Sequence, residues 1–360
     1  MRTSTRQIAG IRSLLFPVVL VAGCGGGGGL GAPQDSGPAE SLISPDLIVD
    51  GGPGRDGIPA LSSPRFEAAS TIQTVAADDL VVVVRDGDAI KAFPEDILDW
   101  HEIVNDATGS SSFTLSYCPL TASAVAWLQD TTDSNPTFGV SGLLYNSNLI
   151  LFDRETDTIW AQMLQLAISG ERIREVPTNL QVLEMPFATL QNTFPDAQVL
   201  TRETGHNRNY DRYPYGSYRS DNLLLFPVVR SDQRLHSKAR AIGIHTDNDA
   251  KVYQLDGFGP STQTINDNFM GQSIVVVGNS ADQFSAIYSS ELSDGSVLGF
   301  TPIQDDLPNV MTDAEGGVWD IFGTAVSGPR AGEQLATVRS YSAMWFAWSS
   351  FFSNVQIHFN

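Results

Sequence analysis

Alternating and continuous hydrophobic runs after residue 79 predict a chain made mainly of β-strands. Two runs rich in β-branched residues, 80–84 and 89–93, flank Arg85-Asp86-Gly87-Asp88, a turn sequence typical of β-hairpins. A second β-hairpin is predicted late in the chain, where the apolar runs 241–244 and 250–253 flank Thr246-Asp247-Asn248-Asp249. Further strands are expected at 112–117, 122–128, 148–153, 274–277 and 283–288.

Helices are expected to be few and short. Pro94 precedes Glu95 and Asp96, and proline in the first turn followed by acidic residues is typical of a helix start, which predicts a helix over 95–100. Two more helices are expected at 186–194 and 342–352.

The two hairpins belong to a longer repeat. When 82–200 is laid over 242–359, matching motifs occur in the same order, and the offset drifts only from about 161 to about 158 residues. The sequence therefore predicts an α+β, strand-rich fold of two tandem copies of one unit, related by internal duplication and a pseudo-twofold axis. The matches are Asp88-Ala89 with Asp249-Ala250, Ile103-Val104-Asn105-Asp106 with Thr264-Ile265-Asn266-Asp267, Trp160 with Trp319, and Ala167-Ile168-Ser169-Gly170 with Ala325-Val326-Ser327-Gly328.

The N-terminus has the features of a secretory signal. Residues 1–23 contain three arginines, no acid and a short apolar run, and they end in Leu20-Val21-Ala22-Gly23-Cys24, which resembles a bacterial lipobox. The resemblance implies cleavage before Cys24 and a lipid on its sulfur; the alternative is an ordinary signal peptide. Gly25, where an inner-membrane lipoprotein would carry Asp, indicates an outer-membrane anchor facing the periplasm or the cell surface.

This interpretation divides the chain into five parts. They are a signal peptide (1–23), a lipidated, flexible Gly/Pro-rich tether (24–55), a first copy (56–205), a Tyr/Arg-rich connector (206–235) and a second copy (236–360).

Charge and motif content exclude several classes of protein. A formal net charge of −20 is unfavourable for nucleic-acid binding. The sequence has no phosphate-binding glycine loop, no serine nucleophile elbow and no His-Glu-x-x-His zinc motif. Lipidation of Cys24 would leave Cys118 as the only thiol, so no internal disulfide is expected.

Several first-copy motifs together resemble DUF3179, a family of secreted prokaryotic proteins defined as a domain of unknown function. The resemblance extends from Asp56 to the C-terminus and implies no settled activity. Some members of that family have Cys-Pro-Leu-Cys where this chain has Thr121 in the fourth position, which argues against a dithiol redox centre. The motifs are Asp56-Gly57-Ile58-Pro59-Ala60-Leu61, Trp100-His101-Glu102-Ile103-Val104-Asn105-Asp106, Tyr117-Cys118-Pro119-Leu120, Phe138-Gly139-Val140-Ser141-Gly142, Asp153-Arg154-Glu155-Thr156 and Trp160-Ala161-Gln162.

Differences between the copies indicate where a site lies. His101 and Cys118 of the first copy align with Thr262 and Asn279. Cys118 is a candidate nucleophile, redox thiol or soft metal ligand, and His101 is its candidate base or a second ligand. His206 is the candidate third ligand, and a transition metal is the candidate cofactor. In the alternative interpretation, Cys118 is a buried core residue and His101 bonds to the backbone.

The connector and two first-copy residues are candidate ligand-binding groups. Tyr210, Arg212 and Tyr215 belong to a Tyr/Arg-rich stretch that could line a pocket for an anionic or sugar-like ligand, or could form a clasp between the copies. Arg154 aligns with Ala314, and Gln162 with Ile321, so both are specific to the first copy.

Taken together, these features predict a lipid-anchored extracytoplasmic protein that binds a small ligand or metal ion around Cys118 and His101. The first alternative is a thiol-dependent enzyme with Cys118 as nucleophile and His101 as base. The second is a scaffold for protein–protein interaction. Membrane attachment is expected through Cys24, and no nucleic-acid partner is expected.

Overall fold

The computed structural model describes residues 40–108, 111–129 and 137–359. The predicted signal peptide and Cys24 lie outside these residues. The described part of the predicted tether differs from a flexible leash, because β1 (Ile48–Asp50) pairs with β9 and the Ile43 side chain is buried. Ile43 packs against apolar residues such as Ile150 and Ile168, which explains why this stretch is folded.

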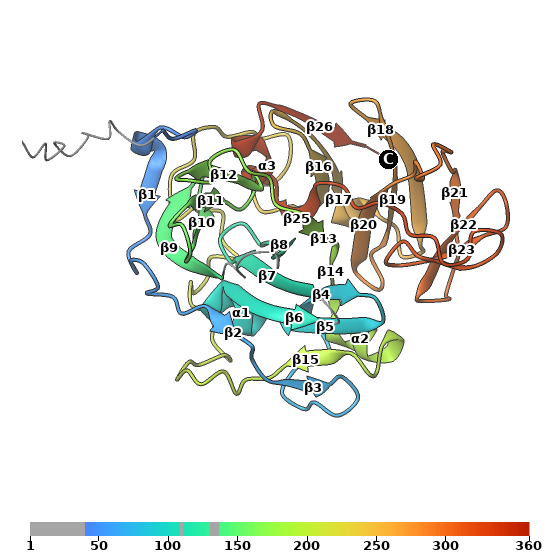
Figure 1. The fold of residues 1–360 in the computed structure, drawn as a ribbon, viewed down its shortest axis with the longest axis horizontal. Helices are drawn as coiled ribbons and strands as arrows, with labels where there is room; N and C mark the ends of the chain where they lie inside the picture. The colour runs from blue at the N-terminus through green and yellow to red at the C-terminus, as the bar shows by residue number, and fades with distance from the viewer. Residues whose placement is uncertain (1–39, 109–110, 130–136, 360) are drawn as a thin grey trace, which may run out of the picture. The chain divides into compact units, whose positions relative to one another are not determined.

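The first half of the chain, residues 56–205, supplies most strands of three five-stranded sheets (Figure 1). In spatial order the first sheet is β1, β9 (Phe138–Tyr145), β10 (Asn148–Asp153), β11 (Ile159–Ala161) and β12 (Leu166–Ser169). The second is β13 (Asn179–Leu180), β8 (Ser123–Leu128), β7 (Ser111–Cys118), β6 (Ile103–Thr108) and β2 (Leu61–Ser62). The third is β14 (Val182–Pro186), β4 (Leu80–Asp86), β5 (Ala89–Pro94), β15 (Gln198–Leu200) and β3 (Phe66–Ala68).

The second half, residues 236–360, supplies three further sheets. They are β25 (Ser340–Met344), β16 (Arg240–His245), β17 (Asp249–Gln254) and β26 (Asn354–His358); β18 (Gln263–Phe269), β19 (Gln272–Asn279) and β20 (Phe284–Ser289); and β21 (Phe300–Pro302), β22 (Asn309–Asp313), β23 (Val318–Asp320) and β24 (Ala325–Ser327). The helices of the described residues are α1 (Glu95–His101), α2 (Phe187–Thr193), α3 (Trp345–Phe351) and the single 3₁₀ turns η1 (Pro45–Leu47) and η2 (Leu255–Gly257).

Sheet topology is similar in the two halves. The order β14-β4-β5-β15 of the first half has the same arrangement as β25-β16-β17-β26 of the second. Within these two sets of four strands, β5 pairs with β15 and β17 pairs with β26 in parallel, and the other neighbouring strands are antiparallel. The meander β9-β10-β11-β12 likewise corresponds in order to β21-β22-β23-β24.

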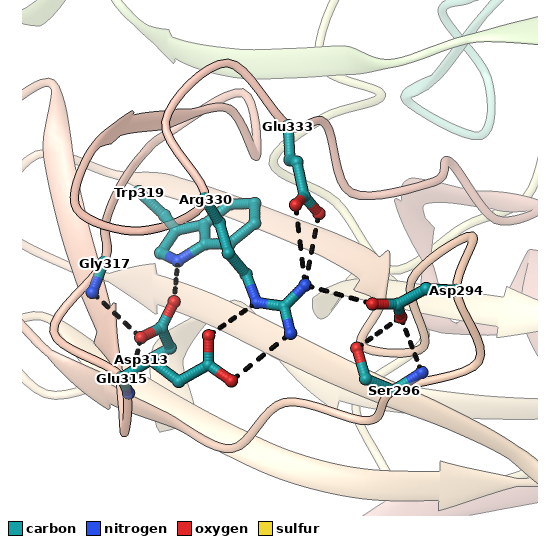
Figure 2. Close-up of polar contacts among 8 residues, drawn as sticks. All are labelled: Asp294, Ser296, Asp313, Glu315, Gly317, Trp319, Arg330 and Glu333. Carbon is teal, nitrogen blue, oxygen red and sulfur yellow. Dashed lines mark hydrogen bonds and ion pairs between the residues drawn. The ribbon is translucent and has the colours of Figure 1, made fainter.

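Individual hydrogen bonds recur at corresponding positions. The indole Nε1 of Trp160 donates to Asp153 Oδ2 across 3.0 Å, and Trp319 Nε1 donates to Asp313 Oδ2 across 2.7 Å. Figure 2 shows the second of these bonds, beside Arg330, which lies among three carboxylates. Asn105 exchanges two hydrogen bonds with the backbone of Phe138, and Asn266 does the same with Phe300.

The two largest hydrophobic clusters each contain residues of both halves. One joins Trp127 and Trp160 of the first half to Trp345 and Trp348 of the second. The other joins the β4–β14 layer of the first half to Val275 and Trp319 of the second. In agreement with this exchange, β14 packs against β20 and β25 packs against β8. Each half therefore completes the core of the other.

The predicted strands and hairpins are largely confirmed, whereas the α+β label overstates the helical content. Asp86 pairs with Ala89 around Gly87, whose φ of +58° suits glycine at this turn. The three α-helices of the described residues have seven residues each, so this part of the chain is mostly β. The predicted helix 342–352 is wrong over its first three residues, because Ser342 to Met344 pair with β16.

Candidate functional site

Helix α1 presents two buried carboxylates on one face. Glu95 and Asp99 are one helical turn apart and are only 5% and 4% exposed. A single nitrogen of the connector, Arg219 Nη2, lies 3.1 Å from Glu95 Oε2 and 2.8 Å from Asp99 Oδ1. The hydroxyl of Tyr117, from β7, donates to Glu95 Oε2 and accepts from Arg219 Nη2. The four side chains form one network, which we call the α1 cluster.

Burial dominates the electrostatics of the α1 cluster. Removal from water raises the pKa of Asp99 well above its ordinary value, Arg219 opposes this shift and Glu95 adds to it. Burial also raises the pKa of Asp96, with Arg202 opposing. Glu95 Oε1 is buried and has no hydrogen-bond partner among the described residues. The cluster is therefore short of positive charge.

The α1 cluster lies in the wall of an open pocket of about 850 Å³, the α1 pocket. Ligand sites commonly have volumes of about 300–1,000 Å³. Its lining includes six carboxylates and three guanidinium groups: Asp78, Asp79, Glu95, Asp96, Asp99 and Asp211, with Arg202, Arg212 and Arg219. Carboxylates thus outnumber guanidinium groups in the lining.

His101 is fully buried at the end of α1 and already has two partners. Its Nδ1–H donates to the Pro59 carbonyl across 2.8 Å, and its Nε2 accepts from the Tyr210 hydroxyl across 2.7 Å. This tautomer follows because a carbonyl can only accept. Burial lowers the pKa of His101 to about 4. The ring is therefore neutral, and its one lone pair is occupied.

Cys118 is a buried thiol at the end of β7. Its Sγ lies 3.8 Å from the Ser147 carbonyl oxygen, which accepts from it. Burial raises the pKa of Cys118 to about 11, with the nearby Glu102 adding to the shift. A thiol held protonated in this way is a poor nucleophile and a poor metal ligand.

The three predicted metal ligands do not form a ligating group in the structure. His206 is exposed, with its ring centroid 5.2 Å from that of His101. Within the part of the chain that the structure describes, no group of three or more His, Cys, Asp or Glu side chains is placed to hold a metal ion. His101 in addition uses both ring nitrogens within the protein, and Cys118 is buried.

The connector covers the turn that follows β7 of the first half. Tyr213 and Tyr218 donate hydrogen bonds to the carbonyls of Pro119 and Leu120. Tyr215 donates to Glu102 Oε1 across 3.3 Å, and burial raises the pKa of that carboxyl to about 8. Tyr215 is therefore engaged within the protein.

Of the other predicted ligand-binding residues, two line the α1 pocket and two lie elsewhere. Tyr210 and Arg212 are in the pocket lining. Arg154 makes a two-pronged ion pair with Asp56, at 2.7 and 2.5 Å. Gln162 is fully buried and bonds to Ser123 and Asn148.

One signal for the α1 cluster lies in the sequence outside the motifs. The β4–β5 hairpin has the same pairing as β16–β17, and this register aligns Glu95 and Asp99 with Leu255 and Gly259. In the register that aligns His101 with Thr262, Glu95 falls on Asp256 and Asp99 on Pro260, so Asp99 is the carboxylate that lacks an acidic counterpart in both registers. Acidic residues at this position favour a helix start through the helix dipole, and no local pattern predicts that Arg219 reaches them.

A family profile matches most of the chain. The family profile described as "Protein of unknown function (DUF3179)" matches residues 55–355. No curated protein and no solved structure matches the chain. Among the described helices, none has the length and apolarity needed to cross a membrane. The match spans most of the sequence, and the chain belongs to the DUF3179 family, a family of uncharacterised domains.

Proposed function

We propose that the protein binds a small cationic, amine-bearing molecule in the α1 pocket. The observation that carries the proposal is the pair of buried carboxylates, Glu95 and Asp99, which share one guanidinium nitrogen. An ammonium group of a ligand would add the positive charge that these carboxylates lack.

The surroundings of the pair favour a donor rather than an acceptor. Glu95 Oε1 is buried without a partner, and a buried acceptor of this kind gains free energy when a donor reaches it. The excess of carboxylates in the pocket lining attracts cations and repels anions. These features argue against the anionic ligand considered from the tyrosines and arginines alone.

Ligand binding would be coupled to proton release. The raised pKa of Asp99 means that the empty site holds a proton more readily than an ordinary aspartate does. A bound cation favours the ionised carboxylate, so affinity should increase as pH rises through the pKa of Asp99.

Isothermal titration of the purified protein with putrescine and with L-lysine tests the proposal. Asp99→Asn and Glu95→Gln should each weaken binding by at least about tenfold, which corresponds to about 1.4 kcal/mol. Glu315→Gln, an exposed carboxylate beside Arg330, is the matched control and should have no effect. Absence of binding by either amine, or equal affinity in Asp99→Asn, would contradict the proposal.

We further propose that the protein is exported and held at the outer membrane by lipid on Cys24. The support comes from the sequence: a basic start, a short apolar run, small residues before Cys24 and Gly25 after it. Metabolic labelling with a fatty acid should tag the wild type but not Cys24→Ala. A Cys24→Ala protein that still carries the label would rule this attachment out.

We also infer that the two halves derive from an internal duplication and are related by a pseudo-twofold axis. The support is the matched strand order, the matched Asp–Trp and Asn–Phe bonds, and the reciprocal packing of β14 on β20 and β25 on β8. An experimental structure in which the halves do not superpose in chain order would refute this inference. Under the proposal, the second half is mainly scaffold for the α1 pocket.

A further inference from the structure

A second cavity, of about 230 Å³, lies where the two halves meet, and we call it the seam cavity. Strands β4 and β14 of the first half contribute Leu80 and Glu184, and strands β16, β20 and β25 of the second half contribute Arg240, Ser285 and Ser342. A single water needs only about 10–15 Å³ measured in this way, so the cavity has room for a molecule of several non-hydrogen atoms.

The charged wall of the seam cavity has an unused donor. Arg240 Nη2 makes a short ion pair with Glu184, whereas Arg240 Nε is buried and has no partner among the described residues. Burial raises the pKa of Glu184 to about 7, although Arg240 opposes the shift. An anionic ligand group in the cavity would lie beside this guanidinium group and add to its negative partners.

The rest of the lining has both polar and apolar groups. Ser285 and Ser342 line the cavity, and Asp256 adds a second carboxylate besides Glu184. Leu80, Leu255 and Phe284 give it an apolar side. A matching ligand therefore has an anionic end, a cationic end and a small apolar body.

The corresponding place in the first half is filled by the protein itself. There the turn after β7 receives hydrogen bonds from Tyr213 and Tyr218 of the connector, and the Thr121 carbonyl accepts from the Met344 amide. In the second half, Asn279 and Ser280, which align with Cys118 and Pro119, line the seam cavity instead. Among the described residues, the hydrogen bonds from the connector tyrosines reach the turn of the first half and not that of the second.

We propose that the seam cavity binds an amino-acid-sized zwitterion with a short apolar side chain. Its carboxylate pairs with the Arg240 guanidinium group and accepts from the hydroxyl of Ser285 or Ser342, and its ammonium group lies against Glu184 or Asp256. This site adjoins the α1 pocket, because Leu80 lines both, but it does not depend on the function proposed for that pocket.

L-valine is the probe, titrated calorimetrically into the full-length protein, with isovalerate and isobutylamine as analogues that lack one charge each. Valine should bind at least about tenfold more tightly than either analogue. Ser285→Leu, which fills the cavity, should weaken valine binding at least about tenfold. The double variant Glu184→Gln/Arg240→Gln should weaken valine binding to the same extent, and it leaves no buried charge unpaired. It replaces Ser285→Leu in the test if that variant fails to fold.

The variant Asp99→Asn distinguishes binding in the seam cavity from binding in the α1 pocket. It should leave valine binding unchanged while weakening putrescine binding in the α1 pocket. The inference is overturned if valine does not bind at about millimolar concentration, if both cavity variants bind it as the wild type does, or if Asp99→Asn abolishes it. Failure of putrescine with success of valine would remove only the function proposed for the α1 pocket.

Discussion

Arg219 Nη2 lies 3.1 Å from Glu95 Oε2, although the two residues are 124 positions apart in the chain. The bond joins the connector to the first turn of α1, and the same nitrogen also reaches Asp99. The guanidinium group additionally lies over the Tyr213 ring, 4.4 Å from its centroid. Arg219 therefore fixes the connector against the wall of the α1 pocket.

Replacing Arg219 by Ala should lower the free energy of unfolding by about 1–3 kcal/mol, because two buried carboxylates lose a charged donor. The effect is expected at the lower end, since the Arg219 side chain is 38% exposed and solvent screens its charge. Urea unfolding near neutral pH measures the change. Asp99→Asn in the Arg219→Ala background should restore part of the loss, because it removes one of the unpaired charges.

Arg65→Ala is the matched control for Arg219→Ala. Arg65 pairs with Glu203 at 2.6 Å, but both side chains are more than 70% exposed. Its loss should change stability by less than about 0.5 kcal/mol. If Arg219→Ala has an effect as small as this control, the α1 cluster does not hold the connector.

Glu102→Gln should flatten the pH dependence of stability. Burial raises the pKa of Glu102 from 4.5 to about 8, so the folded state binds this proton more tightly than the unfolded chain does. The stabilisation is complete below pH 4.5 and is lost as pH rises towards about 8, with a slope of at most about 1.4 kcal/mol per pH unit. Gln keeps an acceptor for Tyr215 and cannot ionise, so urea unfolding of the variant should lack this slope.

An exposed acid provides the reference for this pH series. Glu67→Gln, on the exposed side of β3, should follow the wild-type curve at every pH. His101 acts in the opposite direction, because its pKa is lowered to about 4 and stability is lost as pH falls through it. The difference between wild type and Glu102→Gln isolates the carboxyl group. Coincident curves for these two proteins would mean that Glu102 is not held protonated.

Local signals in the sequence predicted the strands well. The turn at Gly87 and the β-branched run that forms β4 were both predicted, because a tight turn and a strand depend on residues within a few positions of each other. The helix predicted from Ser342 began late, because residues 340–344 pair with β16 about 100 positions earlier. Pairing over such a distance leaves no local pattern.

The candidate site was only partly predictable for the same reason. The differences between the copies predict a site in the first half, where Cys118 and His101 are the most reactive of the differing residues. The structure instead makes them a buried thiol and a neutral, hydrogen-bonded ring. Burial raises the pKa of the one and lowers that of the other, and the extent of burial depends on connector residues that spacing alone does not place.

Cys118 should resist alkylation in the folded protein. With a pKa of about 11, roughly one thiol in a thousand is ionised near pH 8, and the side chain is only 1% exposed. Iodoacetamide treatment followed by peptide mass spectrometry should detect labelling of Cys118 only in denaturant. Rapid labelling of the native protein would instead support the thiol-enzyme alternative.

Neither half should fold by itself. Trp127 and Trp160 of the first half share a hydrophobic cluster with Trp345 and Trp348 of the second. The other large cluster contains residues of β4 and β14 from the first half together with Trp319 from the second. A fragment ending at Arg230 would leave that apolar surface in water, at a cost of about 25 cal/mol per Å². Separate fragments 1–230 and 231–360 should therefore show no cooperative unfolding, whereas mixing them should restore it. The intact chain cleaved after folding at an engineered protease site between Arg230 and Ser231 is the control, and it should stay associated. Cooperative unfolding of either isolated fragment would show that the halves are independent domains, each with a core of its own.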